Sequence, residues 1–354
     1  MNLGNTARAA WRRVKDPVLA GKGTLLQRLL YRMLAGFVAR HKASLAADDL
    51  RARALWLMYH PEAGVLPCEG WRMKRPPRPA AVEISALRAR LAADTASVNA
   101  RLGLSDLSLG EAPCGTCDGK RVAVHVHAFF PEILPRILSA LDAADVPCDL
   151  FVSVPEGVTL PADVAARPHC TVRTCPNRGR DLAPLLCLFG KELASYDCIA
   201  HFHTKKSAHV TDRADWLGHV LGQLLPGADG VRKIFGLLAD GYGMVSPSDY
   251  LDVSEDPTGW MRNRAAAADL AKRGGLEVDL CRDFTPMAFP QGSMFWARGD
   301  FLKRFFELPL TFDDFPAEPI GVDGSPAHAL ERLFFLWGQG TGLRVARLTE
   351  GGRA

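Results

Sequence analysis

Two short polar stretches decide the fold expected for this chain: Asn177-Arg178-Gly179-Arg180-Asp181 and His203-Thr204-Lys205-Lys206-Ser207. Each begins at the end of a short apolar, strand-like segment, 170–175 for the first stretch and 198–203 for the second. In an open α/β sheet, ligands bind outside the carboxyl ends of the strands. Two cationic stretches at two such ends therefore predict a pocket for a phosphorylated ligand.

The chain after residue 120 alternates strand-like and helical segments. Strands are expected over 122–128, 149–154, 171–175, 198–203, 243–247, 293–297 and 343–346. Helices are expected over 131–144, 181–193, 300–308 and 326–337, with further amphipathic helices between 204 and 240. Strands that alternate with helices at this spacing predict a Rossmann-like, three-layer α/β fold with a largely parallel sheet.

The first third of the chain differs in charge and in periodicity. Residues 1–120 carry 19 Lys and Arg against 10 Asp and Glu, whereas residues 121–354 carry 24 against 29. The change of sign supports a domain boundary near residue 120. Apolar periodicity predicts helices over 24–41, near 48–60 and over 84–102. We therefore predict an α-helical N-terminal region over 1–118, followed by the α/β domain over 119–350.

The segment 24–41 has an apolar face with arginines elsewhere on the helix. Leucines, methionine, phenylalanine and valine recur in pairs four residues apart, and Arg28, Arg32 and Arg40 lie off that face. Two interpretations stay open. The face packs on the rest of the protein, or the helix lies as a basic amphipathic segment on an anionic membrane surface.

Composition restricts the cellular location and the binding partners that can be expected for this chain. The chain has 354 residues, 48% hydrophobic and 23% charged, as in soluble globular proteins. No apolar run approaches the roughly 20 residues that span a bilayer, and no signal peptide is visible. The expected location is the cytoplasm, with peripheral contact at the inner face of the plasma membrane through residues 24–41. Basic residues lack an aromatic stacking platform, so no nucleic acid is expected as a partner.

Five sequence blocks carry a family resemblance. They are Val124-His125-Val126-His127 with Phe129-Phe130-Pro131-Glu132, the two polar stretches above, Phe289-Pro290-Gln291-Gly292-Ser293-Met294-Phe295-Trp296-Ala297-Arg298, and Asp323-Gly324 with His328-Ala329-Leu330-Glu331-Arg332. In this order over 122–346, they resemble the rhamnan synthesis protein F family of polysaccharide-assembly proteins, regarded as glycosyltransferases. The resemblance implies transfer of a sugar, rhamnose being a candidate, from a nucleotide-sugar donor to a surface polysaccharide or lipid-linked glycan acceptor.

The layout is also similar to sugar-nucleotide transferases with a GT-A type domain. In those enzymes an Asp-x-Asp pair at the end of a central strand holds a divalent cation against the diphosphate. This sequence has His203-Thr204-Lys205-Lys206 at that point. The two lysines would neutralise the leaving diphosphate directly, which favours metal-independent transfer. No cofactor is firmly implied beyond the nucleotide sugar as donor substrate, and a divalent metal is not favoured.

The resemblance and the chemistry of glycosyl transfer together suggest roles. The donor-binding candidates are Asn177, Arg178, Gly179, Arg180, Asp181, His203, Lys205, Lys206 and His127, and the acceptor-side candidates are Gln291, Gly292 and Ser293. Transfer with inversion needs a carboxylate base on the acceptor hydroxyl, for which the candidates are Asp323 and Glu331. Each carboxylate also has an ordinary interpretation, since Glu331 can pair with a neighbouring arginine and Asp323 can start a turn.

Two pairs of histidines stand two residues apart on predicted strands, so each pair shares one face of the sheet. They are His125 with His127 and His201 with His203. If the two strands are neighbours, the pairs approach each other at the pocket as a metal site or, in the favoured interpretation, as hydrogen-bonded side chains. Two rival functions stay open. One is a non-catalytic carbohydrate-binding or scaffolding subunit, and the more distant one is a metal-dependent hydrolase.

Overall fold

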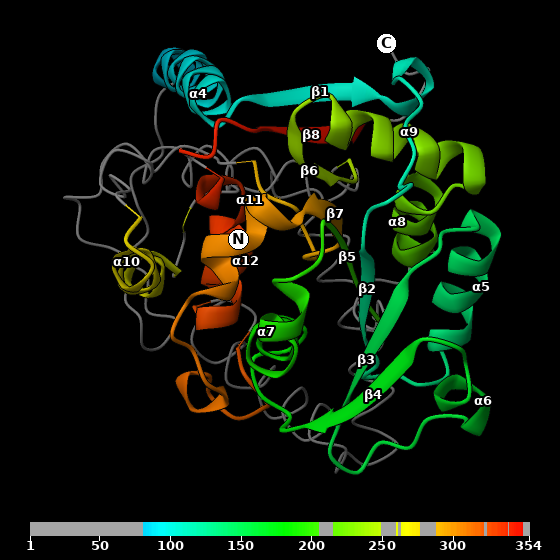
Figure 1. The fold of residues 1–354 in the computed structure, drawn as a ribbon. Coiled ribbons are helices and arrows are strands. Elements are labelled where there is room, and N and C mark those ends of the chain that lie inside the picture. Colours follow the sequence, from blue (N-terminus) through cyan, green and yellow to red (C-terminus); the bar gives the residue numbers. More distant parts are fainter. Residues whose placement is uncertain are drawn as a thin grey trace, which may run out of the picture. The chain divides into compact units, whose positions relative to one another are not determined.

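The computed structural model describes residues 81–204, 215–248, 260, 263–276, 288–321, 324–338 and 340–349. The chain divides into two units, one of 1–65 with 72–87 and one of 66–71 with 88–354. The second unit contains one eight-stranded sheet (Figure 1). Its strands are β1 (Leu104–Ser108), β2 (Val122–His127), β3 (Asp149–Pro155), β4 (Cys170–Cys175), β5 (Cys198–His203), β6 (Tyr242–Ser246), β7 (Phe295–Arg298) and β8 (Arg344–Thr349).

The order of the strands places a crevice in the middle of the sheet. The order is β1-β8-β6-β7-β5-β2-β3-β4, and β7 alone among these strands runs antiparallel to its neighbours. From β2 the chain moves outward to β3 and β4 on one side, and then returns to β5 on the other side. The loops that follow β2 and β5 therefore diverge. Such a topological switch point is where ligands bind in open α/β sheets.

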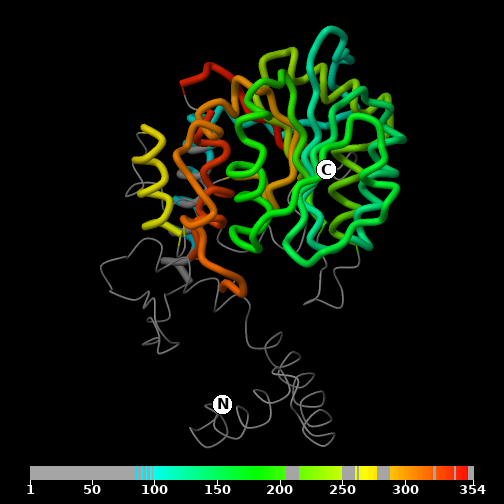
Figure 2. Tube along the Cα trace, turned by 60° about the horizontal axis from the view of Figure 1, so that its bottom comes forward, coloured from blue at the N-terminus to red at the C-terminus, as the bar shows by residue number. Residues whose placement is uncertain are grey.

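Helices cover both faces of the sheet (Figures 1 and 2). One face carries α5 (Leu134–Ala144), α8 (Trp216–Leu224) and α9 (Ala228–Ala239), and the other carries α7 (Gly190–Leu193), α10 (Arg264–Arg273), α11 (Gly299–Phe306) and α12 (Pro326–Trp337). Each face has its own hydrophobic core, and successive residues of a strand enter alternate cores. On β2, for example, Val122 and Val124 belong to the core under α5, whereas Ala123 belongs to the core under α12.

The predicted α/β architecture is confirmed, and so is the helix expected over 84–102, which is α4 (Ala81–Leu102). The helix expected over 181–193 has a different form. It begins with a π-helical segment, Pro184–Leu188, in which the amide of Phe189 donates to the carbonyl of Pro184 at 3.3 Å. This wide turn brings the Phe189 ring to 5.5 Å from the ring of His125. Single-turn π segments of this kind recur at functional sites.

The edge strand β1 was not predicted from the sequence. Its five residues contain no β-branched or aromatic side chain, so strand propensity gives no signal there. It pairs in parallel with β8, and Arg347 donates to Asp106 at 2.6 Å. The domain boundary predicted at 118–119 stays a prediction, although β1, which precedes this boundary in the sequence, is part of the sheet.

The helices predicted over 24–41 and near 48–60 lie outside the described residues. Among the described residues, no helix is long and apolar enough to cross a membrane.

Removal of β1 tests the predicted boundary. A chain that begins at residue 119 lacks β1 and leaves one edge of β8 unpaired. We expect its free energy of unfolding to lie about 2 kcal/mol or more below that of a chain that begins at residue 103, because ladder hydrogen bonds and the Asp106–Arg347 pair are lost. Urea denaturation of both chains, monitored by circular dichroism, measures the difference in unfolding free energy. Equal stabilities would show that the sheet is complete without β1.

Candidate functional site

A cavity of about 750 Å³ opens at the carboxyl ends of β2 and β5, at the switch point of the sheet. Its lining comes from segments that are far apart in the sequence. The contributors are His127, Phe129 and Phe130 after β2; Asn177, Arg180, Asp181 and Leu182 after β4; His203 and Thr204 after β5; Gly292 and Ser293 before β7; Glu318 and Pro319; and Ala327, His328, Glu331 and Arg332 of α12. The cavity thus joins the blocks that carry the family resemblance.

The register between β2 and β5 brings the two histidine pairs together. The strands are parallel neighbours, with His125 opposite His201 and His127 opposite His203. The ring centroids of His125 and His201 are 4.9 Å apart, and the two ring planes are within 6° of parallel. The contacts described next are hydrogen bonds, in line with the favoured interpretation of these histidines.

Five residues form a continuous row of hydrogen bonds, which we call the histidine chain. Nε2 of His201 lies 3.2 Å from Oδ2 of Asp181, and Nδ1 of His201 lies 2.9 Å from Nδ1 of His125. Nε2 of His125 lies 3.0 Å from the hydroxyl of Ser153, which is 2.9 Å from Nδ1 of His127. Sequence reasoning missed Ser153. The available signal was a serine in the middle of the otherwise apolar stretch 150–155.

Burial shapes the protonation of this chain. Burial lowers the pKa of His127 to about 3, and it lowers the pKa of His125 well below the ordinary value, with His201 adding to the effect. Burial by itself would raise the pKa of Asp181. The neighbouring His203 and the hydrogen bond with His201 outweigh burial, so the pKa of this carboxyl lies well below its usual range. Asp181 is therefore ionised, and His125 and His127 are neutral, near pH 7.

A tight turn after β4 directs two of the predicted residues into the cavity. Gly179 and Arg180 have φ angles of 65° and 53°, and a Cβ on Gly179 would lie 2.5 Å from the Cβ of Ala183. Glycine is therefore required at position 179. Past this turn, Arg180 and Asp181 line the cavity. The guanidinium of Arg180 donates to the carbonyl of Gly321 at 3.3 Å.

Arg178 was predicted to bind phosphate in the cavity, but its side chain makes other contacts. Its guanidinium donates to the carbonyl of Phe315 at 3.3 Å and lies 3.4 Å from a carboxylate oxygen of Asp313, and the residue does not line the cavity. Asn177, by contrast, does line it. The segment 313–317 comes close to the turn only in the folded protein, so the sequence carried no sign of this contact. The phosphate-binding role of Arg178 stays a prediction.

The turn before β7 links His203 to Glu331. Nε2 of His203 is 2.8 Å from the carbonyl oxygen of Gly292, and the amide of Gly292 donates to Glu331 at 2.6 Å. Gly292 has a φ angle of 79°, and a Cβ there would lie 2.4 Å from the Trp216 ring. Gly292, Ser293 and Glu331 line the cavity, whereas Gln291 does not. Their catalytic and acceptor-side roles stay predictions.

The end of β5 does not offer the carboxylate pair of a metal-dependent transferase. Its described residues there are His203, which bonds to Gly292, and Thr204, whose hydroxyl accepts from the amide of Phe130 at 2.8 Å. Oxygen-rich donor sets with carboxylates are what divalent manganese or magnesium prefer. The side chains at this point therefore do not fit such an ion. No group of three His, Cys, Asp or Glu within the described ranges could hold a metal ion.

Three predicted site residues lie outside the described residues, namely Lys205, Lys206 and Asp323. Lys205 and Lys206 follow Thr204 directly, so they continue from a residue that lines the cavity. Asp323 precedes Gly324, whose amide donates to Asn263 at 2.9 Å. The roles assigned to these three side chains stay predictions.

Comparison with known proteins decides the family. The family model described as rhamnan synthesis protein F matches residues 90–341, which is more than half of the chain. The chain belongs to the rhamnan synthesis protein F family. This membership confirms the resemblance found in the sequence blocks. The matched region covers β1 to β7 and all the described residues that line the cavity.

Two curated relatives of this rhamnan synthesis protein F family member come from Xanthomonas campestris pv. campestris, strains B100 and ATCC 33913. Both are named "Uncharacterized protein WxcX" and are 29% identical over 235 residues, which is 64% of this chain and 32% of the relative. The match thus spans about a third of the relatives' length.

Solved structures have lower sequence identity to this chain than the curated relatives. The mannosyltransferase PcManGT from Pyrobaculum calidifontis, in complex with GDP-Man and Mn²⁺, has a TM-score of 0.37 and 14% identity over 75% of this chain and 65% of that chain. Glucosyl-3-phosphoglycerate synthase from Mycobacterium tuberculosis has a TM-score of 0.31 and 16% identity over 67% of this chain and 74% of that chain.

The buried histidines predict a pH dependence of stability. The pKa of His127 is about 3 in the folded protein against an ordinary value of 6.5, so between these values the unfolded state binds more protons. Stability from this group is present above about pH 6.5 and is lost as the pH falls below it. We expect His127→Asn to reduce the slope of unfolding free energy between pH 6 and 4.5 by about 1 kcal/mol per pH unit.

Chemical denaturation at several pH values measures that slope. Ser246→Ala is the control, because Ser246 is also buried but carries no group that titrates in this range, and this variant should keep the slope of the parent protein. If His127→Asn also keeps the parent slope, His127 is not held neutral by burial.

Proposed function

We propose that this member of the rhamnan synthesis protein F family is a glycosyltransferase. It would move a sugar, with rhamnose as the candidate, from a nucleotide-sugar donor onto a cell-surface polysaccharide or a lipid-linked glycan. One observation supports this most. A cavity at the topological switch point has a guanidinium, that of Arg180, and a carboxylate, that of Glu331, in its lining.

The cationic residues would stabilise the leaving diphosphate. Negative charge develops on the diphosphate as the bond between its oxygen and the anomeric carbon of the sugar breaks. Positive charge already in place lowers the energy of this transition state. Arg180 lines the cavity, and the predicted phosphate ligands Lys205 and Lys206 follow Thr204 of the same lining. We infer that transfer is metal-independent, because His203 and Thr204 stand where a metal-dependent enzyme needs its acidic pair.

The opposite side of the cavity would activate the acceptor. Glu331 lies on α12 beside Gly292 and Ser293, which present backbone where a sugar hydroxyl can approach. A carboxylate base there removes the proton of the attacking hydroxyl. Asp323, eight residues before Glu331 in the sequence, is the second candidate base. Contact of residues 24–41 with the inner face of the membrane would suit a lipid-linked acceptor.

A non-catalytic carbohydrate-binding or scaffolding subunit is the second candidate function. The observation that favours it is the hydrogen bond of 2.6 Å from the amide of Gly292 to Glu331, which gives this carboxylate a structural task. Arg180, likewise, already contacts Gly321 and lies 3.8 Å from Glu318. Binding without turnover would distinguish this function from transfer.

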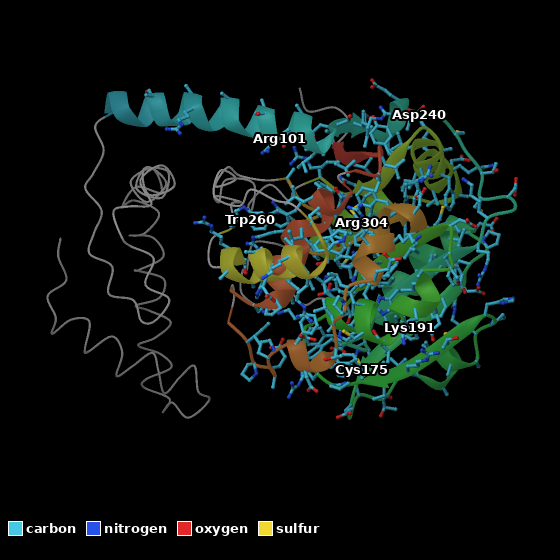
Figure 3. All side chains as sticks on the ribbon, turned by 60° about the vertical axis from the view of Figure 1, so that its left-hand side comes forward. Arg101, Cys175, Lys191, Asp240, Trp260 and Arg304 are labelled. Atoms are coloured by element: carbon cyan, nitrogen blue, oxygen red, sulfur yellow. The ribbon has the colours of Figure 1, made fainter. Side chains whose placement is uncertain are left out.

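Thermal-shift measurements with a panel of nucleoside diphosphates and nucleotide sugars test the proposal. We expect one base to stabilise the protein, with or without EDTA. Lys205→Ala combined with Lys206→Ala should weaken that binding by about 1–3 kcal/mol for each lost contact. Lys191→Ala on α7 (Figure 3), an exposed lysine, is the control. Stabilisation that EDTA abolishes would contradict metal independence, and no response to any nucleotide would favour the binding subunit.

The variant Glu331→Gln tests the base. Glutamine keeps an oxygen that can accept from the amide of Gly292, so the turn should survive while the basic carboxylate is lost. We expect donor binding to be unchanged and release of the nucleoside diphosphate in the presence of acceptor to fall about 10²–10⁴-fold. Glu192→Gln, at a carboxylate that pairs with Arg173 on the surface, is the matched control. Full activity of Glu331→Gln would transfer the assignment to Asp323, to be tested by Asp323→Asn.

A further inference from the structure

The turn 290–293, which precedes β7, is held from two sides of the cavity. The amide of its last residue donates to the carbonyl of its first at 2.8 Å and closes the turn. On one side, the carboxylate of Glu331 on α12 accepts from the amide of Gly292 at 2.6 Å. On the other side, Nε2 of His203, at the end of β5, lies 2.8 Å from the carbonyl oxygen of Gly292. The backbone of Gly292 therefore connects His203 to Glu331.

The hydrogen bond between His203 and Gly292 can have only one direction. A carbonyl oxygen only accepts, so Nε2 of His203 carries a proton and donates it. This direction is the same whether the imidazole of His203 is neutral or charged, because Nε2 is protonated in both cases. The nitrogen that donates to the backbone of the turn is engaged there and is not offered to a bound ligand.

Gly292 is the point of the turn that needs to be held. Glycine adopts more backbone conformations than any other residue, and Gly292 has a φ angle of 79°. Ser293 has a φ angle of 59°, which a residue with a side chain keeps only where its surroundings enforce it. The bonds to Glu331 and His203 fix the two peptide groups on either side of the Gly292 Cα. Loss of either bond frees one of these groups to rotate.

The Trp216 ring at the start of α8 packs against both partners of the His203 bond. A Cβ on Gly292 would lie 2.4 Å from this ring, and the ring centroids of Trp216 and His203 are 6.3 Å apart. Packing of this kind limits how far the turn can move, but it has no directional preference. The hydrogen bond from His203 supplies the direction.

We propose that His203 is a positioning residue for Glu331 and acts through the backbone of Gly292. A carboxylate base must face the acceptor hydroxyl, and a glutamate side chain has several rotatable bonds that must be fixed for this. The amide of Gly292 fixes the carboxylate only while the turn keeps its orientation, which His203 maintains. This assignment replaces the donor-binding role predicted for His203. It rests on the proposed function for the role of Glu331 as the base.

Nuclear magnetic resonance of the full-length protein tests the connection without ligand or activity. Carbon-13 at glutamine carbonyls combined with nitrogen-15 at glycine amides selects the two Gln–Gly pairs of the chain, at 291–292 and 339–340. The signal that moves in Glu331→Gln belongs to Gly292. The other signal, from Gly340, is the internal reference for an undisturbed fold.

We expect the Gly292 signal to move in His203→Asn, because the shorter amide side chain does not reach the carbonyl. In His203→Gln the signal should return toward its position in the parent protein, because the side-chain nitrogen of glutamine reaches about as far as Nε2. A Gly292 signal that stays in place in His203→Asn would overturn the proposal. If the Gly340 signal also moves in that variant, His203→Gln decides, and a Gly292 signal far from the parent position there would overturn the proposal.

Kinetics separate positioning from a purely structural role. The assay follows release of the nucleoside diphosphate from UDP-glucose, GDP-mannose or dTDP-rhamnose, with octyl rhamnoside as the acceptor. We expect His203→Asn to lower kcat about 10–100-fold and to leave the KM for the donor within about twofold of the parent value. His203→Gln should recover most of the lost rate. His219→Asn is the matched control, because Nε2 of His219 also lies 3.2 Å from a backbone carbonyl oxygen, that of Ser248, and His219 does not line the cavity.

Two kinetic results would contradict the positioning role. A raised KM for the donor at unchanged kcat would make His203 a donor ligand, and equal losses of kcat in His203→Asn and His203→Gln would exclude the contact with Gly292 as the cause. If the parent protein transfers no sugar from any of the three donors, or if Glu331→Gln is fully active, the failure lies in the proposed function. The Gly292 signal then decides by itself whether His203 holds the turn.

Discussion

The parallel pairing of β2 with β5 is the constraint on which the site depends. Its register sets His125 against His201 and His127 against His203. The same pairing forms the switch point of the sheet, since the chain leaves β2 in one direction and β5 in the other. A shift of β2 by one residue would turn His125 and His127 to the opposite face, where the valines of β2 now pack, and would separate them from His201 and His203. The crevice and its chemistry therefore have one common origin.

Imidazoles on the core face of a sheet are costly unless their nitrogens are hydrogen-bonded. The histidine chain meets that requirement through Ser153 on the neighbouring strand and Asp181 from the turn after β4. The π-helical segment 184–188 adds an aromatic cover, because it brings the Phe189 ring beside His125. A row of hydrogen bonds enclosed in this way holds two cavity groups in fixed positions. Such preorganisation suits both binding and transition-state stabilisation.

Much of the architecture could be predicted, because apolar periodicity and turn residues are local signals. The strands from β2 onward were expected, whereas β1 escaped because its side chains lack β propensity. At the site, Arg180 and Asp181 line the cavity as predicted, but the Arg178 side chain turns to the segment 313–317. That contact spans more than 130 residues, a distance over which spacing in the sequence has no predictive value.

The sequence by itself determined the class of fold, the polar groups available after each strand and the family resemblance. These depend on residue types and short-range patterns, which are present before folding. The tertiary structure alone decided which groups meet: Ser153 between two histidines, Glu331 against Gly292, and Asp181 at the end of the histidine chain. The physical reason is that strand register and crossover topology set these contacts. Both result from the packing of the whole sheet and leave no local trace in the chain.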